Sequence, residues 1–470
     1  MRRAFAESVG DCRSCRITLR LFRPSANVFF IMMVISMKAA NGLAFRLSRH
    51  VLWASLLAAV SHTQAVTFGI YDPRALAMGG ATVALASPQH AQFYNPALMA
   101  FHDQRAEDSL SGRLYLPLFT LQTSDALIEL EELDQDDLVS RTQTAIGAFN
   151  ATPSMATAIQ LRAEAADLES AVDALDHENL PLEAFAGLAI VEPDNRSGGA
   201  FHLGVRVVGG GVADITDSDR ELLKQYLENL DFIISGGSAG RAGEPPHPEL
   251  FTADGDIIDF TGDIDSTLSG RGAIIVEWGL SAAGEFTFFG HPVALGITPK
   301  LMEVRVYDDM ASVARGDFNS LGDERSHLTG NVDVGMAVEL NSGLRLGLAV
   351  KEVVSQTFST NQGQQVHLRP RSRIGLAYVQ PGYALGLDLD LIQNKPIGFE
   401  QPVQELALGG EVKFSHWAQL RFGYKYDLAQ SHDDALSLGL GLRVYRFLVD
   451  VAYSHGDNNR GGGLQLGLAF

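Results

Sequence analysis

The sequence has 470 residues, with 36 Lys and Arg against 56 Asp and Glu, which gives a formal net charge of −20. This acidic balance argues against nucleic acid or an anionic lipid surface as the main partner, because both bind basic surfaces. Two cysteines exclude a disulfide framework. No run of 18 apolar residues is present that could form a membrane-spanning helix.

Residues 37–65 indicate a secretory signal peptide. Basic residues open this segment, an apolar core follows at 51–60, and small residues precede the expected cut after Ala65. Removing residues 1–65 takes away nine basic and two acidic residues, so the remaining chain carries a net charge of −27 and no cysteine. An exported chain without cysteine is typical of the envelope of a Gram-negative bacterium.

Residues 1–36 stand ahead of this signal and have no role in export. They are predicted to come from a start codon placed too early. The alternative is a genuine extension in which Cys12 and Cys15 form a redox or metal pair.

Residues 66–108 predict a compact amino-terminal segment. Gly79, Gly80 and several alanines keep its side-chain volume small, so it can fold inside a restricted space. Asn95-Pro96 predicts a tight turn, because Asn bonds its own backbone and Pro fixes φ. The plainer interpretation is an amino-terminal arm with a turn.

Residues 109–470 alternate apolar and polar side chains in segments of about ten residues, as strands do when one face is apolar. We predict fourteen strands at 109–121, 184–192, 200–210, 271–281, 286–300, 330–340, 343–354, 367–379, 382–392, 403–414, 417–428, 435–444, 446–455 and 463–470. Short connections alternate with long ones. One short connection is the turn expected at Ala283-Gly284-Glu285.

The predicted fold class is all-β, a closed antiparallel transmembrane β-barrel of about 14 strands. A soluble sandwich also shows such alternation, but its strands are shorter, at about five or six residues. Strands that cross a bilayer need 9–11 residues and must close on themselves so that every backbone group is paired. The chain ends on a strand whose apolar side chains match the signal of outer-membrane barrels: Leu464, Leu466, Leu468 and Phe470.

Two insertions interrupt the barrel in long external loops, at 123–180 and 211–270. Leucines spaced three and four residues apart predict helices at 123–149 and 154–178, and a third helix is expected at Arg220–Ile234 with Asp217 or Ser218 as its cap. These helices are interpreted as a solvated hairpin over the barrel mouth. The alternative is a lid that binds a ligand.

Charged side chains of alternating sign occupy the predicted inward positions of successive strands. Opposite charges on neighbouring strands can form ladders across the lumen wall. We interpret the set as a structural network, with a selectivity lining for a polar solute as the alternative. Its members are Asp333, Glu339, Arg345, Lys351, Arg371, Arg373, Asp388, Asp390, Glu411, Arg421 and Lys425.

The amino-terminal motifs resemble the start of FadL-type barrels, the long-chain fatty-acid transporter superfamily. Within it, the whole pattern is most similar to outer-membrane proteins of the conjugal transfer protein TraF family. The resemblance implies that residues 66–108 form a hatch that plugs the lumen from the periplasmic side. The motif residues that carry it are Arg74, Met78, Gly79, Gly80, Asn95, Pro96 and Ala97.

The expected function is passive passage of a small hydrophobic solute, with the outer membrane as location and both termini in the periplasm. The alternative is a non-transporting component of a conjugal transfer or secretion apparatus. Expected partners are outer-membrane lipid and the barrel-assembly machinery, together with the solute or envelope transfer proteins; nucleic acid is not expected.

Catalysis, cofactors and metals are not expected. Gly236-Gly237-Ser238-Ala239-Gly240 matches GxSxG, but no helix follows, as a nucleophile elbow requires. The acidic loop between Asp254 and Asp265 could hold Ca²⁺, yet it lacks the EF-hand pattern and is interpreted as solvated.

Overall fold

The structure, a computed structural model, describes residues 67–101, 112–128, 138–176, 179–194, 196–236, 245–312, 325–340, 343–429, 434–457 and 459–470. The proposed leader at 1–65, with Cys12 and Cys15, lies outside these residues, as do Ser238 and positions 102–108 of the predicted hatch.

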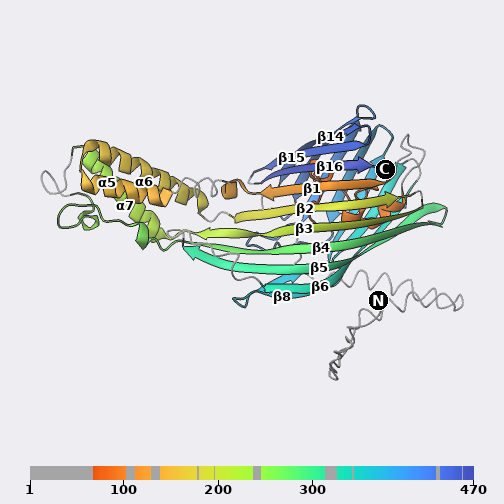
Figure 1. Cartoon of the computed structure of the whole chain (residues 1–470), viewed down its shortest axis with the longest axis horizontal. Helices are drawn as coiled ribbons and strands as arrows, with labels where there is room; N and C mark the ends of the chain where they lie inside the picture. Colours follow the sequence, from red (N-terminus) through yellow and green to blue (C-terminus); the bar gives the residue numbers. More distant parts are fainter. Residues whose placement is uncertain are drawn as a thin grey trace, which may run out of the picture. The chain divides into compact units, whose positions relative to one another are not determined.

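Fourteen strands of the described chain form a closed antiparallel barrel. The barrel closes where β1 (Arg113–Thr123) pairs with β2 (Asn179–Pro193) on one side and with β16 (Arg460–Ala469) on the other. Figure 1 shows the successive strands side by side. The remaining strands of the wall are β3 (Ser197–Asp214), β4 (Thr267–Phe288), β5 (His291–Ser312), β6 (Arg325–Glu339), β7 (Leu344–Lys351), β10 (Arg371–Val379), β11 (Tyr383–Asp390), β12 (Glu405–Lys413), β13 (Ala418–Asp427), β14 (Ala435–Val444) and β15 (Phe447–Gly456). The predicted fold class and strand number are therefore confirmed.

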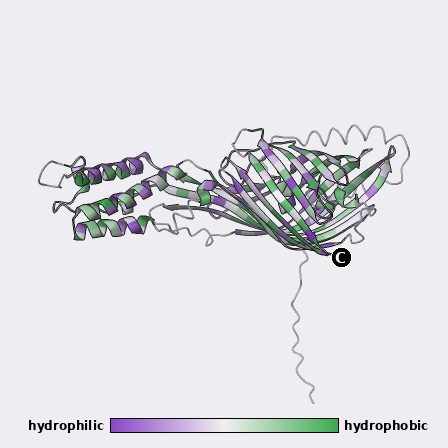
Figure 2. Cartoon of the chain, turned by 90° about the horizontal axis from the view of Figure 1, so that it is seen from above, coloured by the Kyte–Doolittle hydropathy of each residue, from purple (hydrophilic) through white to green (hydrophobic). Residues whose placement is uncertain are grey.

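The two faces of the wall differ as period-two alternation predicts. In β13 the apolar side chains of Leu420 and Phe422 are exposed, whereas Arg421 and Lys425 are buried inside the barrel. Figure 2 shows this alternation of hydrophilic and hydrophobic residues along the strands. Aromatic side chains are exposed near both ends of the strands, at Phe288, Phe289, Phe414, Trp417, Tyr445 and Phe447 by the short turns, and at Tyr424, Tyr426 and Tyr453 by the long loops.

The turn predicted at Ala283-Gly284-Glu285 is wrong. Strand β4 continues through these residues, and the chain reverses at Phe289-Gly290, where both residues have positive φ angles of 48° and 82°. Small residues suggested a turn, but the pairing of Ala283 with Gly296 and of Gly284 with Leu295 extends the ladder across them. Strands β4 and β5 are each 22 residues long, so β5 also runs into the loop predicted from residue 301.

Between β7 and β10 the chain leaves the wall and forms a small hairpin, β8 (Gln356–Ser359) with β9 (Gln365–Leu368). Sequence alternation had placed 343–354 and 367–379 in single strands, so this hairpin was missed. Its apolar side chains pack against β3, β4 and β5, in the cluster Val208, Ala273, Ile275, Met302, Val304, Val306, Phe358, Val366, Leu368 and Ile397.

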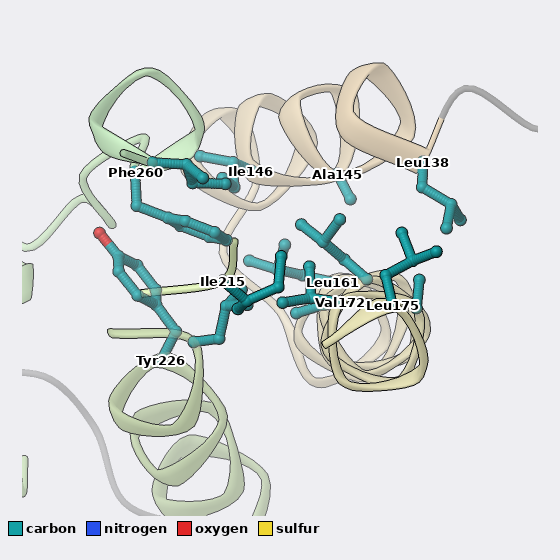
Figure 3. Close-up of a cluster of buried hydrophobic side chains, with 14 of the residues drawn as sticks. Leu138, Ala145, Ile146, Leu161, Val172, Leu175, Ile215, Tyr226 and Phe260 are labelled. Atoms are coloured by element: carbon teal, nitrogen blue, oxygen red, sulfur yellow. The ribbon is translucent and has the colours of Figure 1, made fainter. Parts of the chain in front are cut away.

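The two insertions contribute three long helices with a core of their own. These are α5 (Leu138–Ala151), α6 (Met155–Leu175) and α7 (Asp217–Ile234). Helix α7 begins earlier than predicted, because the side chain of Thr216 caps it by accepting the amide of Asp219 at 3.2 Å. Figure 3 shows how Leu161, Val172, Tyr226 and their neighbours meet between the helices. No helix among the described residues is long and apolar enough to cross a membrane.

Residues 67–101 form a compact segment with one short helix and two 3-10 turns. These are α3 (Pro73–Ala77), η1 (Ala91–Phe93) and η2 (Pro96–Ala100). Helix α3 lies against β14, β15 and β16, and η2 lies against β4, β5 and β6. Strands that are far apart in the sequence therefore surround this segment on different sides. We refer to residues 67–101 as the hatch.

Candidate functional site

The hatch is held together by side chains that cap its own turns. Asp72 accepts the amide of Ala75 at 3.1 Å and the hydroxyl of Tyr94 at 2.7 Å, which joins the two halves of the hatch. Burial and the neighbouring Asp72 raise the pKa of Tyr94, so its phenol stays protonated and donates.

The Asn95-Pro96-Ala97 motif ties the hatch to the wall. Asn95 Oδ1 accepts the amide of Ala97 at 3.2 Å, and Asn95 Nδ2 donates to the carbonyls of Val83 at 2.7 Å and Met336 at 3.1 Å. Met336 belongs to β6, so one amide side chain caps a turn, crosses the hatch and reaches the barrel. The turn predicted here is present, in the form of the 3-10 turn η2.

A buried ion-pair chain anchors α3. Arg74 Nε donates to Glu411 Oε2 at 2.9 Å and Arg74 Nη1 donates to the carbonyl of Leu85 at 3.1 Å. Glu411 also accepts from Arg421 at 2.8 Å, and Arg421 pairs with Asp450. Every charge in this chain has an opposite neighbour, as buried charges require.

A second anchor holds the loop that follows Gly80. Asp388 Oδ2 accepts the backbone amides of Thr82 and Val83 at 2.6 and 2.7 Å. Arg373 Nη1 donates to the Gly80 carbonyl at 3.3 Å and its other nitrogens bind Asp390 and Glu405. Lumenal charges therefore bind the Gly80 carbonyl at the end of the Met78-Gly79-Gly80 motif and the amides that follow it.

The wall has glycine where the hatch comes closest. A Cβ on Gly423 would lie 2.1 Å from the Gly79 nitrogen, and a Cβ on Gly296 would lie 2.3 Å from the Ala97 nitrogen, so neither position accepts a side chain with the hatch in place. The same applies around the barrel at Gly335, Gly347, Gly375, Gly386, Gly409 and Gly439. This glycine belt fits the barrel to the hatch.

A third anchor lies at the first residues of the hatch. Lys351 Nζ donates to the Tyr71 hydroxyl at 2.8 Å and to the Phe93 carbonyl at 2.9 Å. Arg206 donates to Tyr71 at 2.9 Å and to Glu352 at 2.8 Å. Glu352 also pairs with Arg371 at 2.6 Å. This group continues to Lys300, Asp333 and Glu277 through ion pairs of 3.1 to 3.8 Å.

The residues of the predicted charge ladder lie on the inner face. All of them are buried except Glu339, which is half-buried at the end of β6 and pairs with Arg345 at 2.9 Å. Sequence reasoning missed further members of the network, which are Arg206, Glu277, Lys300 and Glu352. Arg206, Glu277 and Lys300 could have been found from the same inward alternation, which continues along the longer strands. The alternation does not indicate Glu352, because this residue follows β7 with a positive φ of 54°.

A cavity of about 150 Å³ lies in the lumen beside the start of the hatch. Thr67, Gly69 and Ile70 of the hatch line it, together with Arg373 and the connection from β11 to β12. Charged lining comes from Glu183, Glu400, Glu405, Arg373 and Lys425, and apolar lining from Ile70, Pro181, Val208, Pro396, Ile397 and Val403. The lining is therefore mixed, with polar groups and apolar surface close together.

The last strand and the acidic loop give simpler results. Leu464, Leu466, Leu468 and Phe470 are all partly exposed on the outer face, and the Phe470 amide donates to the Gly112 carbonyl at 3.1 Å. In the acidic loop Asp259 accepts from Thr261 at 2.6 Å, and no group of three possible metal ligands occurs in the part of the chain that the structure describes.

A model of the family described as "F plasmid transfer operon, TraF, protein" matches residues 92–390. Among solved structures, the toluene transporter TbuX of Ralstonia pickettii matches with a TM-score of 0.45 and 11% identity, covering 86% of this chain and 99% of that one. The CymD monoaromatic hydrocarbon channel has a TM-score of 0.45, 10% identity and coverages of 86% and 99%. A FadL homologue from Pseudomonas aeruginosa has a TM-score of 0.45, 11% identity and coverages of 87% and 99%. No curated protein matches.

Proposed function

The chain belongs to the TraF family of the F plasmid transfer operon, and we propose that it acts as a gated barrel for a small, mainly apolar solute in the outer membrane of a Gram-negative bacterium. The observation that carries this proposal is the hatch. The hatch lies inside a closed barrel. A cavity adjoins its first residues, and the short turns lie at the other end of the strands from this cavity. Passage requires the hatch to move.

The outer face supports a lipid environment. Leucines are exposed on the outer face of successive strands, and aromatic side chains lie near both ends of the strands, as in membrane barrels. Short turns face the periplasm in such barrels. In this orientation β1 begins and β16 ends on the periplasmic side, and the long insertions lie outside.

The solute class follows from the lumen near the cavity. The buried charges of the inner wall that hold the hatch are paired with opposite charges. The apolar cluster under the β8–β9 hairpin adjoins the cavity through Val208 and Ile397, which belong to both. A small apolar solute is therefore expected to enter here, with any polar group turned toward the cavity.

A reversible lock on the hatch tests the proposal. The chain after Ala65 has no cysteine, and the Cβ of Ala407 on β12 lies 4.0 Å from a Cβ built on Gly80, within the 3.5–4.5 Å of a disulfide. In the double variant Gly80→Cys with Ala407→Cys, oxidation should abolish uptake of a small apolar dye into proteoliposomes, and dithiothreitol should restore it. Each single variant serves as a control. Equal uptake by the oxidised and reduced double variant would refute gating by the hatch.

A second candidate function is a non-transporting role in a transfer apparatus, and the helical bundle favours it. Strands β2 to β5 have 15 to 22 residues, whereas β10 to β16 have 8 to 10. The ends of β2, β3 and β4 join the bundle core through Leu180, Ala213 and Leu268. The long strands thus support a separately packed unit. A photo-crosslinker at the exposed Ile159 should capture an envelope protein in cells, and capture of none would remove this candidate.

A further inference from the structure

The short turns of β12–β13 and β14–β15 form one continuous strip at the end of the barrel where the short turns lie. The Arg443 amide donates to the Trp417 carbonyl at 2.8 Å, which joins the two turns. The Arg446 carbonyl accepts the amide of Ala469 at 2.8 Å, which joins the second turn to the last strand. We call these two turns the turn strip, which consists of residues 413–417 and 443–447.

The turn strip carries an excess of positive charge. Its permanent cations are Lys413, Arg443 and Arg446, and its ten residues include neither Asp nor Glu. Lys413 and Arg446 are exposed and form no ion pair within the described part of the chain. The carboxyl terminus at Phe470 follows the residue that pairs with Arg446, and its single negative charge does not balance the strip. In a chain with a net charge of −20, the charge is therefore locally reversed.

The turn between β2 and β3, on the other side of the barrel, differs in charge. Arg196 in this turn follows Glu192 and Asp194 in the sequence. The amide of Glu285 donates to the Arg196 carbonyl at 2.8 Å, so a third acidic residue lies beside the same turn. The positive charge is thus a property of the turn strip and not of all the short turns.

Exposed aromatic side chains accompany the cations of the turn strip. Trp417 is 52% exposed and Tyr445 is 82% exposed. Tyr445 has a positive φ of 60°, in a region where short hairpin turns favour Asn, Asp or Gly. The Arg446 guanidinium lies 5.9 Å from the centre of the Tyr445 ring. An exposed tyrosine that keeps this backbone conformation points to a role for its side chain outside the fold.

The length of the strands places the turn strip at the surface of the bilayer. Strands β12 to β15 have 9 or 10 residues. A tilted strand of this length just crosses the hydrocarbon core of a bilayer. The turns at its ends therefore lie at the level of the lipid headgroups, where aromatic rings concentrate and where cations meet phosphate groups. In the orientation proposed above, this is the periplasmic leaflet.

We infer that the turn strip binds the headgroups of anionic phospholipids in the periplasmic leaflet. Lys413 and Arg446 contact the phosphate, and Trp417 and Tyr445 lie against the glycerol and the first carbons of the acyl chains. An anionic headgroup is preferred to a zwitterionic one, because the strip offers positive charge and no carboxylate side chain to hold a choline or ethanolamine cation. The inference rests on the proposed membrane location and is independent of solute passage.

Trp417 itself can report which lipid lies beside the turn strip. The other tryptophans are Trp53, in the predicted leader, and Trp278 on β4. In a Trp278→Phe chain without residues 1–65, fluorescence comes from Trp417 alone. This chain is reconstituted into phosphatidylcholine vesicles that contain a small fraction of either brominated phosphatidylglycerol or brominated phosphatidylcholine. Bromine quenches tryptophan only at close range, so the ratio of the two quenching values measures the local preference for the anionic lipid.

Removing the exposed cations should abolish this preference. With Lys413 and Arg446 in place, the brominated phosphatidylglycerol should quench about twofold more than the brominated phosphatidylcholine, because each cation near an anionic headgroup adds to binding. In the double variant Lys413→Gln with Arg446→Gln, the two lipids should quench equally. The control is Arg196→Gln with Lys224→Gln, which removes the same charge from the β2–β3 turn and from α7 and should keep the preference. Heat-modifiability on gels shows whether each variant retains the barrel.

Equal quenching by the two brominated lipids with both cations present would overturn the inference, as would a preference that survives in the Lys413 and Arg446 double variant. Glycerol phosphate distinguishes a lipid from a free anion, since it carries the phosphate without acyl chains. If millimolar glycerol phosphate removed the preference, the strip would be a site for soluble phosphate esters and the assignment to lipid would be wrong.

Flotation of the vesicles separates this inference from the proposed function. A chain that does not float with the vesicles would refute the membrane location, and the lipid site with it. A chain that floats but shows no preference would refute the lipid site alone. Dye uptake is not measured, so the result does not depend on whether the hatch moves.

Discussion

Arg74 in the hatch and Glu411 on β12 form a buried ion pair, with 2.9 Å between Nε and Oε2. The pair joins residues 337 positions apart in sequence. Through this pair a charged side chain of the hatch joins the charge network of the wall, because Glu411 is shared with Arg421. The network therefore does more than neutralise the lumen, since its geometry also fixes where the hatch lies.

Replacing Arg74 should loosen the hatch without unfolding the barrel. In Arg74→Gln the bonds to Glu411 and to the Leu85 carbonyl are lost, while Glu411 keeps Arg421. Loss of a charged hydrogen bond costs about 1.5–3 kcal/mol, so amides of residues 72–86 should exchange with deuterium roughly tenfold faster or more. Arg141→Gln is the control, because Arg141 is 40% exposed and pairs with Glu164 in the helical bundle. Equal exchange in both variants would contradict the anchoring role.

The glycine belt gives a prediction about shape. Gly423→Ala places a methyl group 2.1 Å from the Gly79 nitrogen, whereas Gly462→Ala in β16 meets nothing within 4 Å. Both variants should remain heat-modifiable barrels on gels. Only Gly423→Ala should displace the hatch and slow formation of the lock disulfide between positions 80 and 407. Unchanged oxidation rates in both variants would show that the hatch adapts.

Strand parity explains what could be predicted from the sequence. Once Leu420 and Phe422 are assigned to the outer face, Arg421 must point inward, and the same parity places Asp388 and Asp390. The alternation of a strand predicts only which face of that strand a side chain lies on. It does not predict that Asp388 binds the amides of Thr82 and Val83, because this contact joins parts of the chain that are 305 residues apart.

The misplaced turn and the missed hairpin have different causes. Ala283 and Gly284 have the small side chains of a turn, but continuous pairing with β5 overrides that preference. The β8–β9 hairpin is stabilised by Phe358 and Val366 packing on the inner wall, and two four-residue strands show too little alternation to be recognised. The glycine belt could not be predicted from the sequence for a third reason. Only the position of the hatch explains why these wall positions are glycine.

The β8–β9 hairpin should open more readily at mildly acidic pH. Burial, with Arg369 and Lys395 nearby, lowers the pKa of His367, whose Nδ1 lies 3.0 Å from the Thr357 hydroxyl across the hairpin. A lowered folded-state pKa means that the stabilising contribution is present above the ordinary value of about 6.5 and is lost as pH falls through the lowered one. Deuterium exchange of residues 356–368, corrected for intrinsic rates, should rise between pH 7.5 and 5. His367→Gln should remove this dependence, and a dependence retained in that variant would exclude His367 as its source.

The helical bundle should lose its structure separately from the barrel. Leu161 is buried where α6 meets its neighbours, in a cluster that contains none of the hatch residues. Leu161→Ala should cost about 2–5 kcal/mol of bundle stability through the cavity it leaves. Helical circular dichroism should then melt at lower temperature while the barrel stays heat-modifiable. Met155→Ala on the exposed side of α6 is the control and should change neither signal. If Leu161→Ala lowered the barrel transition equally, the long strands β2 to β5 would couple the two units into one cooperative structure, and crosslinking at the bundle could not be interpreted independently of the lumen.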